Sequence, residues 1–248
     1  GELLHRKFPM LKQIQLPLLS IVPNESPADA KRLKELLSVS DLAVFVSPNA
    51  VECSMRLLQT AWPKSIPIAV VGGGSLEALS HHGITAQDGY TIYAPSNPSE
   101  WDSEGLWKIL NQAQASWAGK KVLFLKGIGG RAWLGEQFLL QGAEIHSVAT
   151  YKRMPLADDS PAWLGLKKSH PSDSICVLTS SEAARYLAQY LQENTSWAEP
   201  WLNEAMMLCT HERIAQVCNE LGFKNVDWCA PGDDHLLVKI DQWHSNLN

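Results

Sequence analysis

The sequence predicts an α/β protein built from two similar lobes, and three features of its 248 residues lead to this expectation. Apolar runs of strand length alternate with amphipathic helical patterns along the whole chain, and turns rich in glycine or serine follow the runs. Such alternation is typical of a parallel sheet covered on both faces by helices. The same order of strand, turn and helix occurs twice, which predicts two flavodoxin-like lobes joined by a two-stranded linker.

The first copy of the repeat spans residues 41–84. An apolar run at 42–46 stops at Ser47 and passes into a helical pattern with apolar residues on one face. A second run, residues 68–71, passes through a glycine-rich turn into a short helix that Gly83 closes, since glycine readily adopts the left-handed conformation that ends helices. The copy therefore predicts two successive strand–turn–helix units.

The second copy starts at residue 175, an offset of 133 from residue 42. It repeats the apolar run, a turn of hydroxyl-bearing residues and a helix, and a further strand at 207–209 leads to a helix that ends at Gly222. Prolines before the first copy and the exit after Tyr151 stand at matching points, so the chain is expected to cross between lobes twice. The expected divisions are one lobe at 22–152, the other at 1–18 plus 155–248, and linkers near 18–23 and 151–155.

The remaining elements follow from the same apolar spacing, taken in chain order. The predicted elements are the end of a helix at 2–8, a short strand at 12–16, a helix at 28–37, an edge strand at 90–93, a helix at 103–117, a strand at 120–125, a helix at 132–141, a strand at 144–150, a helix or loop around Trp163, a strand at 226–230 and a final helix.

Composition excludes several functions. The net charge is −5 and the pI is near 5.9, with no long run of Lys or Arg, so a groove for nucleic acid is not expected. The five cysteines lack a C-x-x-C spacing and are expected to be reduced core thiols. No apolar stretch approaches the ~20 residues of a membrane helix, and no secretory pattern opens the chain. The sequence therefore predicts a cytoplasmic protein that does not bind membranes.

Motifs for metals, cofactors and covalent catalysis are also missing. His81 and His82 point to different faces of a helix, so they cannot form a metal site together. The glycine turns at 72–74 and 127–130 could be dinucleotide loops, but neither fits G-x-G-x-x-G with an acidic residue at the required distance. We expect no metal and no cofactor.

The chain instead has many strand ends followed by small or hydroxyl residues that open helices. In a parallel sheet these turns share the carboxyl edge, where helix N-termini bind carboxylates. The alternative is that each serine or threonine is an ordinary N-cap. Arg131 and Arg213 also open helices, where a positive charge is unfavourable unless an anion lies nearby. The candidate substrate-binding residues are Ser47, Asn49, Gly74, Ser75, Gly129, Gly130, Arg131, Thr179, Ser180, Ser181, Arg213 and Ile214.

Several motifs together resemble the uroporphyrinogen-III synthase family over nearly the whole chain. They are Val46-Ser-Pro-Asn-Ala-Val51, Gly72-x-x-Ser75, Lys126-Gly-x-Gly-Gly-Arg131, Tyr151-Lys-Arg153 and Leu178-Thr-Ser-Ser181. The resemblance implies a cofactor-free lyase that takes linear hydroxymethylbilane, removes its terminal hydroxyl as water, and closes the ring with the last pyrrole inverted.

The same resemblance implies the site and the partners. The substrate would be a linear tetrapyrrole with eight carboxylates, held in a cleft between the lobes, and Tyr151 would donate a hydrogen bond to the leaving oxygen through a partly exposed hydroxyl. A monomer that meets hydroxymethylbilane synthase transiently is expected. A two-lobed binding or sensor protein that closes on a small anion without turnover is the alternative, because fold alone does not fix function.

The repeat also predicts that one strand is missing from this chain. The counterpart of residues 121–125 would fall before Gly1, and in the family such a strand opens the protein. In a doubly wound sheet it would lie between residues 12–16 and 175–179. We therefore expect those two segments to be separated by the width of one strand rather than hydrogen-bonded to each other.

Overall fold

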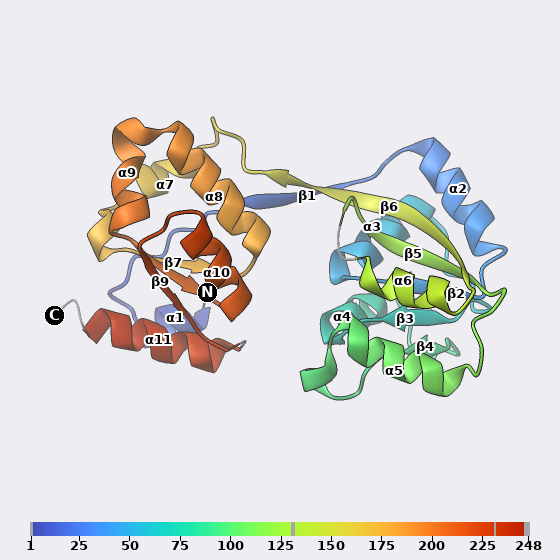
Figure 1. The fold of residues 1–248 in the computed structure, drawn as a ribbon. Helices are drawn as coiled ribbons and strands as arrows, with labels where there is room; N and C mark the ends of the chain where they lie inside the picture. Colours follow the sequence, from blue (N-terminus) through green and yellow to red (C-terminus); the bar gives the residue numbers. More distant parts are fainter. Residues whose placement is uncertain (1, 130–131, 231, 246–248) are drawn as a thin grey trace. The chain divides into compact units, whose positions relative to one another are not determined.

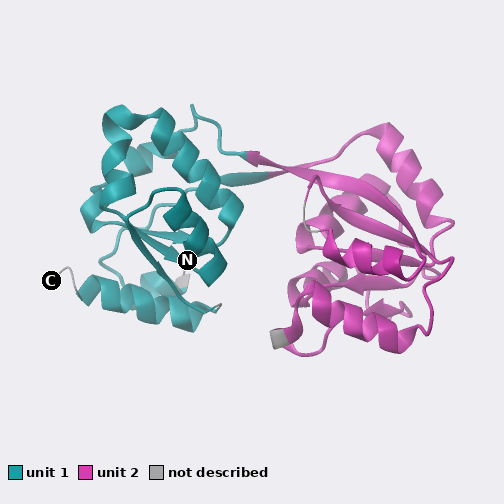
Figure 2. Ribbon diagram, in the orientation of Figure 1, with its two compact units in different colours: residues 1–20, 155–248 teal, residues 21–154 magenta. Residues whose placement is uncertain are grey.

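The computed structural model describes residues 2–129, 132–230 and 232–245. The chain divides into two compact units (Figure 2), of which unit 1 comprises Gly1–Ser20 with Pro155–Asn248 and unit 2 comprises Ile21–Met154. Both units contain sheets of mainly parallel strands covered by helices, so the predicted α/β class is confirmed. None of the helices in the described part of the chain has the length and apolar character that a membrane crossing needs.

Unit 2 contains a sheet with the strand order β1-β6-β5-β2-β3-β4 (Figure 1). The strands are β1 (Leu19–Pro23), β2 (Leu42–Phe45), β3 (Ile68–Val70), β4 (Ile92–Tyr93), β5 (Lys121–Gly127) and β6 (Glu144–Pro155). β2 pairs in parallel with β3 on one side and with β5 on the other, and every residue of β2 is buried. A fully apolar strand is what such a central position requires.

Helices cover both faces of this sheet and form two separate apolar clusters (Figure 1). One cluster packs α2 (Pro27–Leu37), α3 (Pro48–Leu58) and α4 (Gly73–His81) against the sheet, and the other packs α5 (Ser103–Ala113) and α6 (Trp133–Leu140). Gly83 follows α4 with a φ of 69°, as its place behind the helical pattern predicted, and Gly142 follows α6 in the same way with a φ of 79°.

Unit 1 contains a smaller parallel sheet with the order β7-β8-β9. Its elements are α1 (Glu2–Lys7), α7 (Trp163–Lys167), β7 (Ile175–Leu178), α8 (Ser181–Glu193), α9 (Thr195–Asn203), β8 (Met206–Cys209), α10 (Glu212–Glu220), β9 (Asn225–Trp228) and α11 (Asp233–Ser245). Residues of α7, α8, α9 and α10 form one apolar cluster. A much smaller cluster contains Phe8, just after α1, Ile240 of α11 and Leu208 of β8.

Two predicted elements are wrong in extent or kind. Residues 12–16 have no regular secondary structure, and the strand lies later, at Leu19–Pro23, beside β6 in the sheet of unit 2. The alternating pattern of residues 12–16 was not sufficient, because a strand also needs a neighbour for its backbone groups. The helix expected at 103–117 ends at Ala113.

Candidate active site

A cavity of about 370 Å³ lies in unit 2 at the ends of three strands. It is lined by Ser47 after β2, by Lys126 and Gly127 at the end of β5, and by Tyr151 and Arg153 on β6. β2, β5 and β6 are parallel, so these residues meet at the carboxyl edge of the sheet, where α/β proteins bind ligands. The cavity therefore brings together Ser47 and Tyr151, two predicted site residues that are 104 positions apart in sequence, and Gly129 also lines it.

Tyr151 is the central polar group of this cavity. Its Oη lies 3.0 Å from Oγ of Ser47, and Nη2 of Arg153 donates to the same Oη at 3.3 Å. The side chain is 1% exposed, so the expectation of a partly exposed hydroxyl is wrong. The reason is that the ring packs into the core beneath α3 while Ser47 and Arg153 replace the water that an exposed phenol would bind.

Gly127 allows the tyrosine to take this position. A Cβ at residue 127 would lie 2.7 Å from the Tyr151 ring, closer than non-bonded carbon atoms approach one another. β5 and β6 pair residue by residue up to Lys126, and the register then shifts so that Gly127 lies opposite Tyr151. This bulge, a feature common beside active sites, directs the ring toward Ser47.

Positive charge at the cavity comes from Arg153 and Lys126. The guanidinium of Arg153 lies 5.6 Å from the centre of the Tyr151 ring, a cation–π distance. The sequence-based site did not include these two residues. Arg153 could have been found, because residues i and i+2 of a strand point to the same face and Tyr151 was already a candidate.

Ser47 serves two purposes at once. Its Oγ accepts a hydrogen bond from the Ala50 N–H at 3.1 Å, so it is the N-cap of α3, and the same oxygen meets Tyr151. The two readings of Ser47 from the sequence, cap and ligand residue, are therefore compatible. The helix N-terminus and its partial positive charge lie at the cavity.

The other predicted site residues of unit 2 differ in their position relative to the cavity. Gly129 lines the cavity and has a φ of 80°, whereas Ser75 is buried within α4 and Asn49 is exposed at the start of α3. Gly74 approaches α3 closely, since a Cβ there would lie 3.1 Å from Cγ of Pro48. Gly130 and Arg131 lie outside the described residues.

The predicted residues of unit 1 follow β7 and β8 at the corresponding edge. Ser180 is the N-cap of α8 and accepts from two backbone amides, Thr179 is exposed beside it, and the Oγ of Ser181 is buried without a hydrogen-bond partner among the described residues. Arg213 is exposed in the first turn of α10, where His211 caps the helix. Ile214 packs in the core and its amide is bonded to the His211 carbonyl, so it offers no side-chain contact to a ligand.

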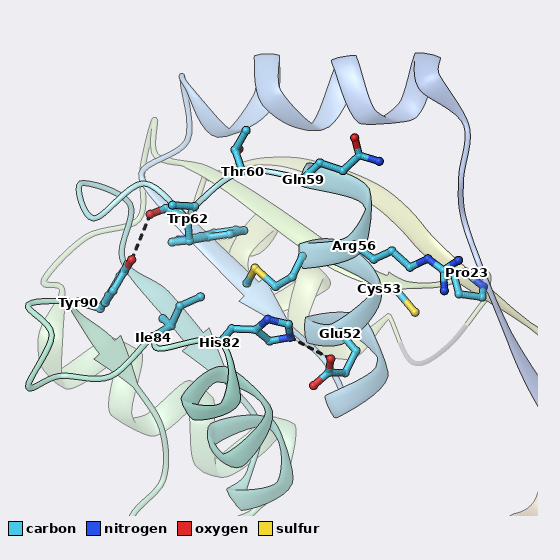
Figure 3. A pocket seen from close by; sticks show the side chains of 12 residues that line it. Pro23, Glu52, Cys53, Arg56, Gln59, Thr60, Trp62, His82, Ile84 and Tyr90 are labelled. Atoms are coloured by element: carbon cyan, nitrogen blue, oxygen red, sulfur yellow. Dashed lines mark hydrogen bonds and ion pairs between the residues drawn. The ribbon is translucent and has the colours of Figure 1, made fainter.

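A second hollow in unit 2, of about 630 Å³, lies near the C-terminal end of α3 (Figure 3). Its polar side chains bond within the hollow or to its rim: His82 Nε2 lies 2.9 Å from Oε2 of Glu52, and the Tyr90 hydroxyl donates to the Trp62 carbonyl at 3.4 Å. Burial raises the pKa of the Cys53 thiol in its wall, which disfavours the reactive thiolate. None of the predicted site residues lines it, and α3 runs away from the carboxyl edge, so we place the site at the Tyr151 cavity.

Groups that could hold a metal are absent from the part of the chain that the structure describes. The five cysteines are free thiols, and the closest described pair, Cys209 and Cys218, has its sulfur atoms 3.7 Å apart in the core of unit 1.

Comparisons with known proteins identify relatives of the chain. Residues 11–235 match the family described as uroporphyrinogen-III synthase HemD. Among curated relatives, uroporphyrinogen-III synthase of Escherichia coli (strain K12) is 25% identical over 251 residues, and that of Salmonella typhimurium is 28% identical over 248 residues. Each alignment covers 98% of this chain and 96% of the relative.

Solved structures share the fold. A mutant uroporphyrinogen III synthase from the extremely thermophilic bacterium Thermus thermophilus has a TM-score of 0.61 at 14% identity, with 99% of this chain and 93% of that chain covered. The enzyme from Helicobacter pylori 26695 has a TM-score of 0.64 at 15% identity, with 94% and 95% covered. Because the family match spans nearly all of both units, the chain belongs to the uroporphyrinogen-III synthase family.

Proposed function

We propose that the chain converts hydroxymethylbilane to uroporphyrinogen III in tetrapyrrole biosynthesis, with loss of water and inversion of the last ring. The family match over residues 11–235 carries this proposal. The Tyr151 cavity supports it, because it offers a hydrogen-bond donor in Tyr151 and positive charge for carboxylates in Arg153 and Lys126.

We assign Tyr151 to the leaving hydroxyl. An electron-rich pyrrole already assists departure of hydroxide, so the protein needs only to place a donor near the oxygen and to stabilise the charge that develops. The phenol O–H can donate to one acceptor, which is Ser47 Oγ or the substrate oxygen. Arg153 donates to the same Oη, and this makes the phenol a better donor toward the substrate.

We assign substrate carboxylates to the cations and helix N-termini around the strand ends. In unit 2 these are Arg153, Lys126 and the first turn of α3, together with Asn49, Gly74, Ser75, Gly129, Gly130 and Arg131 from the sequence. In unit 1 they are Thr179, Ser180, Ser181 and Arg213. Holding both ends of a flexible tetrapyrrole would favour the inverted closure over the simple one.

We further propose that the chain works as a cytoplasmic monomer that receives its unstable substrate from hydroxymethylbilane synthase. Sedimentation of the purified chain, alone and mixed with that enzyme, tests the monomer and the transient partner separately.

The catalytic role is tested by Tyr151→Phe. Purified protein is mixed with hydroxymethylbilane, and the uroporphyrinogen III and I isomers are separated, since substrate that escapes the enzyme closes spontaneously to the I isomer. Removal of a hydrogen-bonding acid group lowers formation of the III isomer by about 10²-fold. Because the hydroxyl is buried and bonded, the variant also loses about 1 kcal/mol of unfolding free energy.

Two controls separate catalysis from stability. Tyr90→Phe removes a phenol bonded to a backbone carbonyl outside the cavity and keeps full activity. Ser47→Ala and Ser26→Ala each remove an N-cap, of α3 and α2, and each costs about 1 kcal/mol, but only Ser47→Ala lowers turnover. If wild-type protein yields only the I isomer, the chain is no synthase; if folded Tyr151→Phe protein keeps the wild-type rate, the tyrosine is structural.

A further inference from the structure

The glycine turn at residues 72–74 of unit 2 is covered by the side chain of Trp101. A Cβ at Gly73 would lie 2.3 Å from Cη2 of Trp101, and 2.7 and 2.8 Å from the neighbouring ring carbons Cζ2 and Cζ3. Because these two carbons are almost as close as Cη2, Gly73 lies against the face of the six-membered ring and not at its edge. A Cβ at Gly72 would lie 3.0 Å from Cβ of Trp101. The turn therefore needs glycine to make room for the indole.

Trp101 is also one of the exposed large apolar residues of the chain. It is 45% exposed, and since one face of the indole lies against the glycine turn, the surface that solvent reaches is the opposite face. A single exposed tryptophan needs no functional explanation by itself. Its anchoring and its position in the fold decide what this open face can bind.

The indole is held in place by the loop that connects β4 to α5. Nε1 of Trp101 donates to the Pro95 carbonyl at 3.2 Å, and the Trp101 backbone N–H donates to the Pro98 carbonyl at 3.3 Å. The next residue, Asp102, is the N-cap of α5 and accepts from the Gly105 N–H at 2.7 Å. A side chain fixed in this way loses little conformational entropy when a ligand packs against it.

The position of Trp101 is beside the Tyr151 cavity. Val71, directly before the glycine turn, and Ser103, two residues after Trp101, both line that cavity. β3 and β4 run parallel to β2, so the turn and the loop lie at the same carboxyl edge of the sheet as Ser47. In the strand order β3 is three strands from β6, which is roughly 14 Å at the usual strand spacing. The open indole face therefore lies at the cavity's far side from Tyr151.

The chemistry of this face suits a flat uncharged ring and not a carboxylate. The indole N–H is already bonded to Pro95, so it has no hydrogen bond to give to an anion. Glu100 and Asp102 flank Trp101 in the sequence, and their negative charges disfavour a second carboxylate nearby. Aromatic rings instead stack on one another in offset arrangements, with a gain beyond the area that they bury. In a linear tetrapyrrole the flat uncharged groups are the pyrrole rings.

We propose that the open face of Trp101 stacks on one pyrrole ring of the linear tetrapyrrole, and that this ring is not the one whose hydroxyl leaves. The identity of the ligand rests on the proposed function. The separation of three strands between β3 and β6 keeps the stacked ring away from the ring beside Tyr151. A contact far from the reacting atoms is made equally in the ground state and the transition state, so it lowers KM and leaves kcat unchanged. Trp101 thus binds the substrate without taking part in its chemistry.

The test measures binding without turnover. The probe is a bilane with the same rings and carboxylates as the substrate but with a methyl group in place of the terminal hydroxymethyl group, so it cannot lose water. Its Kd is measured by titration calorimetry for the original chain and for Trp101→Leu, Trp101→Phe, Gly73→Ala and the double variant with Gly73→Ala and Trp101→Leu. Gly73→Ala keeps the indole but displaces it, because the new Cβ would lie 2.3 Å from the ring. Urea unfolding checks that each variant is folded.

We expect Trp101→Leu to raise the Kd about five- to tenfold, which is the gain of an aromatic pair beyond its buried area, and Trp101→Phe, which keeps an aromatic face, to raise it by no more than about twofold. Gly73→Ala should weaken binding by a similar factor in the original chain and have no effect once leucine replaces Trp101, because the new Cβ then meets no ring. The same pattern should appear in the KM for formation of the III isomer, while kcat stays the same.

Three results would overturn the proposal. The first is an equal Kd for the original chain and folded Trp101→Leu, which would mean that the indole only covers the turn. The second is equal weakening by Gly73→Ala with and without Trp101, and the third is no binding of the bilane by the original chain. The proposed function fails separately: a chain that binds the bilane through Trp101 but yields only the I isomer would be a binding protein, whereas formation of the III isomer with an unchanged Kd in Trp101→Leu would refute the stacking alone.

Discussion

β2 and β7 are the corresponding strands of the two units, and their surroundings differ far more than their sequences. Leu-Ala-Val-Phe in β2 and Ile-Cys-Val-Leu in β7 are equally apolar and each begins a parallel pairing with the next strand. Every residue of β2 is buried, whereas three of the four in β7 are partly or largely exposed. Val44 is 0% exposed and Val177 is 37% exposed.

The difference shows that burial of an apolar strand is decided by its neighbours in the sheet. β2 has β3 on one side and β5 on the other, and helices cover both faces. β7 has β8 on one side and a groove on the other, and the cluster beneath it that joins α1 to α11 contains few buried residues. Unit 1 should therefore be the less stable unit and should tolerate changes that unit 2 does not.

The largest expected effect separates Val44→Asp from Val177→Asp. A carboxylate at Val44 would be buried between two strands without a partner, which costs more than about 4 kcal/mol and unfolds unit 2. The same change at Val177 meets solvent in the groove and costs about 1 kcal/mol or less. Urea unfolding followed by circular dichroism measures both; similar losses in the two variants would show that the groove is closed in solution.

The sequence was a good guide to β2 and β7 as strands but could not distinguish their environments. Apolar runs, turn residues and glycines such as Gly83 and Gly142 are local signals, and the structure confirms them. Residues 12–16 show the limit of that approach. Their alternation describes side chains only, while strand formation also depends on backbone partners supplied by distant parts of the chain.

The sequence likewise predicted individual residues of the candidate site but not how they contact one another. Turn residues after strands identified Ser47, and the resemblance identified Tyr151, but nothing local showed that these two would share a hydrogen bond. The burial of Tyr151 depends on Gly127 and on a bulge between β5 and β6. Such a shift in register is a property of two paired strands and leaves no pattern in either one.

A medium effect is expected at the end of β5, a strand without a counterpart in the described part of unit 1. In Gly127→Ala the new methyl group would meet the Tyr151 ring at 2.7 Å and push it from Ser47, at a cost of about 1–3 kcal/mol and with loss of III-isomer formation. Gly135→Ala is the control for stability only, because Gly135 also lines the cavity. A Cβ there meets nothing within 4 Å, and alanine in helix α6 stabilises by about 0.5–1 kcal/mol, so a loss of stability in Gly127→Ala alone is due to the clash with Tyr151. Full activity in the Gly127→Ala variant would show that turnover does not depend on the position of the Tyr151 ring.

The smallest expected effect concerns the residues that precede β2 and β7. Asp41, just before β2, accepts from the Lys121 N–H at 2.8 Å and pairs with Lys120 at 3.0 Å, so it ties β2 to β5. That backbone hydrogen bond, aided by Lys120, lowers the pKa of the Asp41 carboxyl below its ordinary value. The corresponding residue of unit 1 is Ser174, whose hydroxyl bonds to the His170 carbonyl instead.

A lowered folded-state pKa means that Asp41 contributes stability above its unfolded pKa of about 3.9 and loses the contribution as the pH falls through the folded value. Asp41→Asn should therefore cost about 0.5 kcal/mol at neutral pH, a small value because the pair is partly exposed and screened, and progressively less as the solution is acidified below about pH 4. Ser174→Asn provides the control, since it changes no charge and its effect should not vary with pH. Urea unfolding across this pH range measures the loss of unfolding free energy in both variants. If the loss in Asp41→Asn stays constant as the pH falls, the charge of the Asp41 carboxylate contributes nothing to the contact between β2 and β5.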